Sequence, residues 1–385
     1  MTKKLQKKNN LTILAVETSC DETAMAVIKS EETASGWEFE VLSNVVTSQI
    51  DIHKKWGGIY PELASRAHLE AMLPVLFQAI EPLELNQKLK VKSQNDKSKI
   101  KSAMTEIDVI AVTKEPGLIG SLLMGIETAE ILGAYFQKPV IKVNHLEGHV
   151  YSAFSGVNPK HEARNPKPSF ARGRQIQNLK FKIPKTGIFP ILALVVSGGH
   201  TSLILMQDHL KYKTVAKTID DAAGEAFDKV ARILELPYPG GPEIEKSSKS
   251  GDENAYALPI GMNGKPDFSF SGLKTAVLYL TKNPTTGKKL KYNKADLAAS
   301  FQKVVADTLI QKTRLATSKY EPKTLILSGG VSANSYIRDR FSSEFSRPTP
   351  NAKRLTVLVP PKPLSTDNAV GIAVAGVIKS ANQGL

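Results

Sequence analysis

His145 and His149 are the pair of side chains whose spacing points most directly to metal chemistry. They lie four positions apart in a segment that predicts a helix, so both imidazoles project from one face and can share an ion. Two unrelated histidines would give the same spacing, although the chain has only seven. The metalloprotease pattern HExxH places a general base, Glu, directly after the first His. Here that position is Leu146 and Glu147 lies elsewhere on the helix, which disfavours a protease.

Three glycine pairs mark turns at which a phosphate could bind. A Ser-Gly-Gly turn at 197–199 separates two apolar segments, a second at 328–330 follows another, and Gly240-Gly241 precedes an acidic helix. Glycine has no Cβ, so its backbone N–H groups can approach an anion closely. Neither GxGxxG nor GxxxxGK[ST] occurs, which disfavours a Rossmann or Walker-type nucleotide site.

Acidic side chains supply further candidates. Asp367 lies at the start of the last predicted helix, where a carboxylate can bind an ion or simply cap the helix. Glu225 and Asp228 are three positions apart and share a side of another predicted helix, either as a ligand site or as a solvated face. Cys20 stands beside two acids and has no cationic neighbour in sequence to lower its pKa, so it is not favoured as a nucleophile.

Two similar segments organise the chain. Residues 11–28 and 191–205 are each an apolar run, a short polar turn and a second apolar run, which predicts two hairpins about half the chain apart. Strands and helices alternate around them, as in α/β layers. We therefore expect two similar domains that face each other across a cleft. The predicted helices are 60–80, 119–136, 221–236, 273–280, 294–319 and those from 145, 332 and 365; the predicted strands are 107–113, 140–143, 324–327 and 355–359.

Composition limits the class of protein. A length of 385 residues suggests two domains, a single cysteine excludes an internal disulfide, and 41% hydrophobic residues are typical of a globular protein. No apolar run reaches the roughly 18 residues of a membrane span. The longest candidate, 119–136, carries Glu127 and Glu130, so we expect no membrane segment.

The net charge of +14 resides in four basic tracts at 1–10, 88–101, 160–185 and 281–294, and the rest of the chain is acidic. Their Pro, Asn, Gly and Ser content predicts loops or insertions. Such tracts can be solubilising surface, but four of them on an acidic body favour a polyanionic partner, most plausibly nucleic acid.

Together these motifs resemble the tRNA N6-adenosine threonylcarbamoyltransferases, once described as O-sialoglycoprotein endopeptidases. The resemblance covers about residues 11–376. It rests on ETSCDETA (17–24), GGIYPELASRAHLE (57–70), PGLIGSLL (116–123), NHLEGH (144–149), VVSGGHTSL (195–203), IDDAAGEAFDK (219–229), YPGGPEIE (238–245), FSFSGLKTAV (268–277), LSGGVSAN (327–334) and STDNA (365–369). One departure is Glu115, where the family usually has Gly.

The resemblance implies an actin-like ATPase fold, with two lobes of mixed β-sheet flanked by helices and a nucleotide cleft between them. The expected parts are a basic extension at 1–10, lobes at 11–155 and 191–385, and a basic insertion or linker at 156–190. His145, His149 and Asp367 match the catalytic metal ligands, and iron, zinc and manganese all suit such a set. The positions that match the adenylate-binding residues are Val195, Val196, Ser197, Gly198, Gly199, Asp228, Gly241, Glu245 and Asn334.

The implied activity is transfer of a threonylcarbamoyl group from threonylcarbamoyl-adenylate to the N6 amine of the adenosine 3′ of the anticodon. The expected partners are tRNA, a separate synthase that makes the adenylate, and a second copy in a homodimer. ETSCDETA resembles the bacterial and organellar branch, and the tracts at 88–101 and 160–185 look like insertions, which fits a mitochondrial form; a bacterial-type cytoplasmic protein is the alternative. Two other classes stay open, a small-molecule kinase of the same fold class and a non-catalytic tRNA-binding protein.

Overall fold

The structure, a computed structural model, describes residues 9–86, 96–157, 174–346 and 355–383. Chain contacts divide it into two compact units. Unit 1 comprises Met1–Ile52, Ile59–Thr186 and Asp367–Leu385, and unit 2 comprises His53–Gly58 and Gly187–Thr366. The basic extension at 1–10 and the tracts at 88–101 and 160–185 lie partly outside the described residues.

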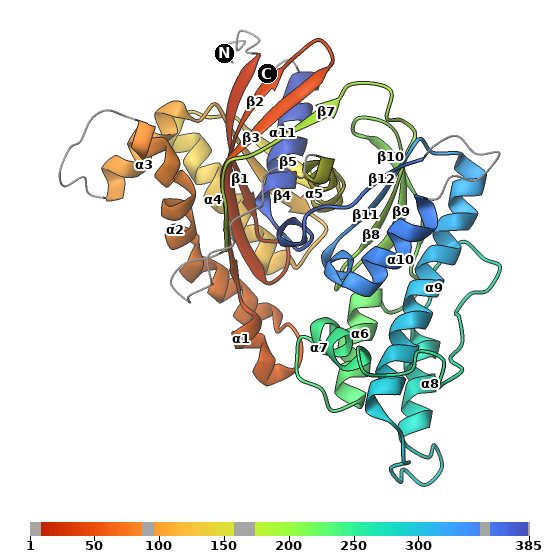
Figure 1. Cartoon of the computed structure of the whole chain (residues 1–385). Helices are drawn as coiled ribbons and strands as arrows, with labels where there is room; N and C mark the ends of the chain where they lie inside the picture. The colour runs from red at the N-terminus through yellow and green to blue at the C-terminus, as the bar shows by residue number, and fades with distance from the viewer. Residues whose placement is uncertain (1–8, 87–95, 158–173, 347–354, 384–385) are drawn as a thin grey trace. The chain divides into compact units, whose positions relative to one another are not determined.

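Unit 1 is built on a seven-stranded mixed sheet in the order β5-β4-β1-β2-β3-β6, with β7 also paired to β3. Strands β1, β2 and β3 form an antiparallel meander, whereas β4 and β5 run parallel to β1 (Figure 1). The strands are β1 (Asn10–Glu17), β2 (Glu22–Glu32), β3 (Gly36–Ser48), β4 (Val109–Glu115), β5 (Val140–Asn144), β6 (Arg174–Ile176) and β7 (Leu179–Pro184).

Helices cover both faces of this sheet, which explains why the end of β1 is buried on both sides. Leu14 and Val16 point to one face and join a core with Met72 and Val75 of α2. The other face packs against α11. The helices of unit 1 are α2 (Pro61–Asn86), α3 (Asp96–Glu106), α4 (Ile119–Phe136), α5 (His145–Ser152) and α11 (Ala369–Gln383), the turn η2 (Ala153–Val157) follows α5, and α1 (Ile50–His53) crosses into unit 2.

Unit 2 repeats the strand arrangement of unit 1. Its sheet has the order β10-β9-β8-β11-β12, in which β8, β9 and β10 form an antiparallel meander and β11 and β12 run parallel to β8. The predicted duplication of a hairpin is therefore confirmed at the level of whole sheets. The strands are β8 (Ile191–Val196), β9 (Thr201–Asp208), β10 (Lys211–Lys217), β11 (Thr324–Ser328) and β12 (Thr356–Leu358).

The core of unit 2 joins alternate residues of β8 to the helices. Leu192 and Leu194 belong to one buried cluster with Phe227 of α6, Phe301 of α9 and Phe341 of α10. The elements are α6 (Ala223–Ile233), α7 (Gly240–Ser248), α8 (Ser271–Thr281), α9 (Lys294–Tyr320), α10 (Ser335–Phe345) and the turns η1 (Lys54–Trp56), η3 (Gly330–Ala333) and η4 (Lys362–Leu364).

Part of the predicted linker at 156–190 is a strand pair rather than a loop. In β7, Leu179, Phe181 and Ile183 are buried and the residues between them are exposed. Lys180 and Lys182 on the exposed side form ion pairs with glutamates of β3. Because these lysines face solvent on one side of the strand, the tract has the polar composition of a loop although it is a strand. The tract at 88–101 likewise enters helix α3 at Asp96.

The last helix belongs to unit 1 and not, as predicted, to the C-terminal lobe. Residues 367–385 fall in unit 1 because α11 packs against β1, β2 and α5. The hydrophobicity of this helix predicted burial, but sequence pattern does not specify which sheet a helix covers. The main crossing between the units, after Thr186, does lie within the predicted 156–190 segment.

Helix α4 is long and apolar enough to cross a membrane by length and composition alone. Only 28% of this stretch is buried. One such helix is weak evidence for a span. Helix α4 packs against α2 and β4, and the small residues Gly125 and Ala129 are among those that it buries. The expectation of no membrane segment stays a prediction.

Two glycines allow α5 and α11 to touch. A Cβ built on Gly371 would lie 1.9 Å from the carbonyl oxygen of Gly148, and a Cβ on Gly148 would lie 2.5 Å from Ile372. Any larger residue at 371 must separate the two helices. This contact sets their distance, and each helix carries or follows candidate metal ligands.

Gly371→Ala should lower the free energy of unfolding by about 1–3 kcal/mol, because the added methyl group overpacks the contact. Gly272→Ala is the matched control: it adds the same methyl to α8, where a Cβ would have no heavy atom within 4 Å. The control should leave stability unchanged or raise it by up to about 1 kcal/mol. Denaturant unfolding measures both, and equal stabilities of the two variants would contradict the packing account.

Candidate functional site

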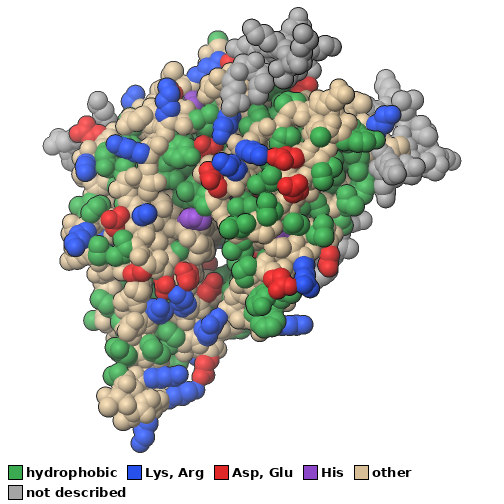
Figure 2. Space-filling view, turned by 180° about the vertical axis from the view of Figure 1, so that it is seen from behind, with side chains coloured by type: hydrophobic (Ala, Val, Ile, Leu, Met, Phe, Trp, Pro, Cys, Tyr) green, Lys and Arg blue, Asp and Glu red, His purple; other side chains and the backbone are tan. Residues whose placement is uncertain are grey.

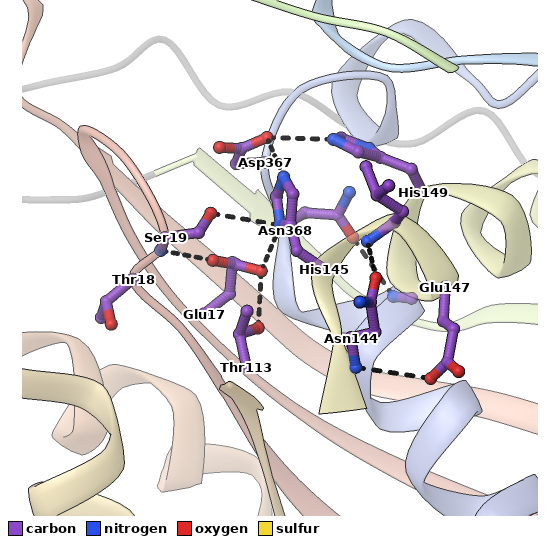
Figure 3. Close-up of polar contacts among 12 residues, drawn as sticks. Glu17, Thr18, Ser19, Thr113, Asn144, His145, Glu147, His149, Asp367 and Asn368 are labelled. Carbon is purple, nitrogen blue, oxygen red and sulfur yellow. Dashed lines mark hydrogen bonds and ion pairs between the residues drawn. The ribbon is translucent and has the colours of Figure 1, made fainter. Parts of the chain in front are cut away.

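The structure brings together His145, His149 and Asp367, which the sequence places far apart. Asp367 Oδ1 lies 3.6 Å from His145 Nε2 and 3.3 Å from His149 Nε2. Candidate ligand atoms of all three residues lie within 4.8 Å of one another, and both imidazoles are buried (Figure 3). All three belong to unit 1.

A capping box fixes the start of the helix that carries both histidines. The Asn144 side chain accepts a hydrogen bond from Leu146 N at 2.9 Å, and the Glu147 carboxylate accepts one from Asn144 N at 3.4 Å. His145 is therefore the first residue of α5 and His149 follows one turn later. Glu147 is directed at the helix terminus and is engaged there, in agreement with the disfavoured protease pattern.

Glu17 lies beneath the cluster and was missed in the sequence. It ends β1 with no exposed surface, and its carboxylate accepts hydrogen bonds from Ser19 N at 2.6 Å and Thr113 Oγ1 at 2.7 Å. The same carboxylate lies 2.9 Å from His145 Nδ1, and Ser19 Oγ lies 3.1 Å from that nitrogen (Figure 3). A charged residue at the end of an otherwise apolar strand is the signal that could have revealed it.

This pair perturbs the protonation of both partners. Burial alone would raise the pKa of Glu17, but the adjacent His145 holds it below its usual value of 4.5. Burial would lower the pKa of His145, whereas Glu17 and Asp367 raise it to about 9. The metal-free protein at neutral pH therefore carries a protonated His145 with Nδ1–H donated to Glu17.

The residues present fit a divalent metal. A carboxylate on Nδ1 fixes the tautomer of a ligating histidine and directs Nε2 at the ion. His145 has this arrangement, and its Nε2 points at Asp367. His149 Nε2 is buried, and among the described residues none forms a hydrogen bond with it. Two imidazoles and one carboxylate are a donor set that iron, zinc and manganese accept.

The turn at 197–199 lies in unit 2, where β8 meets β9. His200 N donates to Ser197 Oγ at 3.1 Å and Ser197 N donates to His200 O at 2.7 Å, which closes the turn. Apart from the chain neighbours of each glycine, no described residue has a heavy atom within 4 Å of the Cβ position of Gly198 or Gly199. A Cβ on Gly224 would lie 2.6 Å from Ser197 O, so helix α6 abuts the turn and its glycine is required there.

Val195 and Val196 precede this turn as the last residues of β8. Both side chains are fully buried. Gly329, directly after β11, has a φ of +89°, and a Cβ there would lie 2.4 Å from Val196 O. The glycine turn at 328–330 therefore packs against the end of β8.

The remaining predicted adenylate residues lie on neighbouring elements of unit 2. The Asp228 carboxylate on α6 accepts a hydrogen bond from Gly240 N at 2.7 Å, next to Gly241, whose Cβ position is open. The Glu245 carboxylate on α7 accepts one from Ser335 N at 3.1 Å. These bonds join α6 to α7 and α7 to α10.

Asn334 caps helix α10. Its side-chain oxygen accepts a hydrogen bond from Ile337 N at 3.1 Å, and its amide nitrogen donates to Gln302 Oε1 at 2.8 Å. The adenylate-binding roles of all these residues stay predictions. Their contacts show that the set belongs to one connected part of unit 2.

Cys20 lies in the turn after Glu17 and is partly buried. Burial, with the nearby charges of Asp21 and Asp367, raises the pKa of its thiol well above the usual value. The thiol is therefore protonated at neutral pH, and the expectation that it is not a nucleophile agrees with this environment.

Comparison with known proteins identifies the class and then the family. The crystal structure of full-length HypF in a phosphate- and nucleotide-bound form matches 97% of this chain and 46% of its own, with a TM-score of 0.53 and 12% identity. This likeness concerns the fold alone, and the predicted two-unit α/β fold of the actin-like ATPase class is confirmed.

The family model for tRNA N6-adenosine threonylcarbamoyltransferase, TsaD, matches residues 40–171 and 174–374. Curated proteins of that name are similar along nearly the whole chain. The relative from Dictyoglomus turgidum is 42% identical over 94% of this chain and 92% of its own length. That from Bacillus subtilis is 39% identical over 97% and 92%, and that from Thermosipho melanesiensis is 43% identical over 94% and 93%. The chain belongs to this family, and the predicted resemblance is confirmed.

Metal binding should release protons. Below pH about 9, His145 must lose its proton before Nε2 can bind an ion, so Zn²⁺ affinity should rise with pH up to that value. At pH ~7.5 we expect about one proton released per ion, measured by calorimetry in buffers of different ionisation enthalpy.

Glu17→Gln should lower the pKa of His145, so that fewer protons are released, and should weaken Zn²⁺ binding about 10- to 100-fold. Glu62→Gln is the control, since Glu62 is exposed on α2 and pairs with Arg66. Unchanged proton release and affinity in Glu17→Gln would show that Glu17 does not orient His145.

Proposed function

We propose that this protein transfers the threonylcarbamoyl group of threonylcarbamoyl-adenylate to the N6 amine of the adenosine 3′ of the anticodon in tRNA. Family membership over nearly the whole chain is the observation that carries this proposal. The cluster of His145, His149 and Asp367 on a buried carboxylate supports it, because it supplies a site for acyl-phosphate chemistry.

The metal dependence is part of the proposal. His145 and His149, through nitrogen, and Asp367, through a carboxylate oxygen, would hold one divalent ion of iron, zinc or manganese. When bound, the ion supplies Lewis acidity for phosphate or carbonyl oxygens. Once His145 has lost the proton on Nε2, the Glu17 carboxylate holds the remaining proton on Nδ1, which is the tautomer that binds an ion through Nε2.

The glycine turns of unit 2 would bind the adenylate. Open space at Gly198, Gly199 and Gly241 lets backbone N–H groups approach the phosphate and nucleoside. In the reaction, the N6 amine attacks the carbamoyl carbon, a C–N bond forms, the C–O bond to phosphate breaks, and AMP and one proton depart. An adenine amine is a weak nucleophile, so positioning and stabilisation of the leaving phosphate supply most of the rate.

An acyl-adenylate is a reactive mixed anhydride, so we propose that a separate synthase supplies it. This feature also separates the proposal from a kinase of the same fold class, which would use ATP directly and transfer phosphate to a hydroxyl. The predicted mitochondrial location stays a prediction.

The predicted homodimer also stays a prediction, and one surface of unit 1 suits it. Helices α2 and α4 pack together and expose large apolar side chains. These exposed side chains, which a contact between copies could remove from water, are Leu69 and Leu73 on α2 and Ile119, Leu123, Ile131 and Tyr135 on α4.

The tRNA backbone would contact the basic loop between α8 and α9. Residues 281–294 carry five lysines and no acid. Lysine and arginine side chains gather at the lower end of Figure 2, where Figure 1 places this loop. Lys288 and Lys291 are exposed, whereas Lys289 pairs with Glu235. Anticodon loops present unpaired bases, so recognition requires no strand opening.

The direct test is mass spectrometry of nucleosides from tRNA incubated with the protein, threonylcarbamoyl-adenylate and a divalent metal. The wild-type protein should form the modified adenosine. His145→Ala and Asp367→Asn should lose at least about 100-fold in rate, because leaving-group stabilisation is removed, while tRNA affinity is retained. Asp339→Asn, at an exposed position of α10, is the control and should react normally. Normal turnover by Asp367→Asn would exclude the metal role.

Lys288→Ala with Lys291→Ala should weaken tRNA binding and reduce the dependence of log affinity on log salt by about 0.7–0.9 for each phosphate that is no longer neutralised. Lys182→Ala removes a charge from β7 in unit 1 that already pairs with Glu38, and should change little. Filter binding at several salt concentrations measures the slope. An unaltered slope in the double variant would place the tRNA elsewhere.

A further inference from the structure

Arg338 joins three separate segments of unit 2 through one guanidinium group. From α10, its Nε donates to Ser332 O at 3.0 Å, its Nη1 to Pro360 O at 2.8 Å and its Nη2 to Ser365 Oγ at 2.9 Å. Ser332 and Ser365 have no exposed surface, and Arg338 itself is partly buried. Nothing in the proposed chemistry uses this residue.

The two ends of this bridge lead to the two predicted ligand sites. Ser332 belongs to η3, the turn between Gly329 and the predicted adenylate residue Asn334. Ser365 follows η4 and is two positions before the candidate metal ligand Asp367. Arg338 thus bonds directly to the turn at 329–334. It also bonds to Ser365, which only one residue separates from Asp367.

Asp367 is the residue at which the chain passes from unit 2 into unit 1. On its C-terminal side, Asn368 caps α11 by accepting a hydrogen bond from Val370 N at 3.1 Å, and Gly371 packs on α5. On its N-terminal side, the segment 360–365 is held to α10 by Arg338. The position of the carboxylate therefore depends on anchors from both directions.

We propose that Arg338 is a positioning residue that couples occupancy of the turn at 329–334 to the placement of the Asp367 carboxylate. A nucleotide bound at this turn fixes Ser332, Arg338 transmits that constraint to Ser365, and metal affinity at the cluster rises. The identity of the two ligands rests on the proposed function. Arginine suits this task because its planar group has five donors in fixed directions, whereas lysine would satisfy only part of the set.

The test uses AMP and Mn²⁺ with the full-length protein, and free Mn²⁺ is counted by electron paramagnetic resonance. In the wild type, AMP should tighten Mn²⁺ binding by at least about 5-fold, and Mn²⁺ should tighten AMP binding by the same factor, since coupling is reciprocal. Arg338→Gln should bring the ratio of the Mn²⁺ dissociation constants measured without and with AMP close to one. Ser365→Ala removes one of the three hydrogen bonds of Arg338, together with the 3.4 Å bond from Ser365 Oγ to Pro361 O, and should also lower the coupling. This variant serves if Arg338→Gln does not fold.

Arg340→Gln is the matched control. Arg340 lies on the same helix but pairs with Asp307 and Tyr336, so the wild-type ratio should persist. The inference is overturned if AMP and Mn²⁺ bind independently in the wild type, or if Arg338→Gln or Ser365→Ala keeps the wild-type ratio. No tRNA or acyl transfer enters the measurement, so its failure is distinguishable from failure of the proposed function.

Discussion

The hydrogen-bonded pair of Glu17 and His145 is the interaction on which the candidate metal centre depends. A carboxylate without exposed surface loses several kcal/mol of hydration, about as much as the pairing returns, and it persists only when donors surround it. Ser19, Thr113 and His145 supply those donors from the turn after β1, from β4 and from α5. One buried charge therefore fixes three elements and orients the imidazole that would bind the ion.

The repeated topology explains why chemistry gathers where it does. In each unit the first strand of the meander runs parallel to a crossover strand, β1 with β4 and β8 with β11. Parallel strands end at the same edge, where ligands of open α/β sheets bind. In unit 1 that edge carries Glu17 and Thr113; in unit 2 it carries Ser197 and Gly329. The same sheet edge thus carries a candidate metal centre in one unit and glycine turns in the other.

Sequence periodicity predicted many of the elements whose apolar pattern is unbroken, but it missed strands β3, β7 and β10. Helix α4 was predicted at its observed bounds, and both hairpins and α9 were predicted within a few residues. Strand β7 was missed because Lys180 and Lys182 share its solvent side. The histidine pair followed from helical spacing, and Asp367 as its partner from family resemblance alone. Glu17 required knowledge that β1, β4 and α5 converge, which no local pattern contains.

The central claim is that Glu17 directs His145 so that two imidazoles and one carboxylate bind a single ion. X-ray absorption of the zinc-loaded protein tests it directly. The account predicts two nitrogen ligands at about 2.0–2.1 Å and a carboxylate oxygen at about 2.0–2.2 Å. A thiolate sulfur at about 2.3 Å, from the single cysteine Cys20, or a first shell without imidazole nitrogen would contradict it.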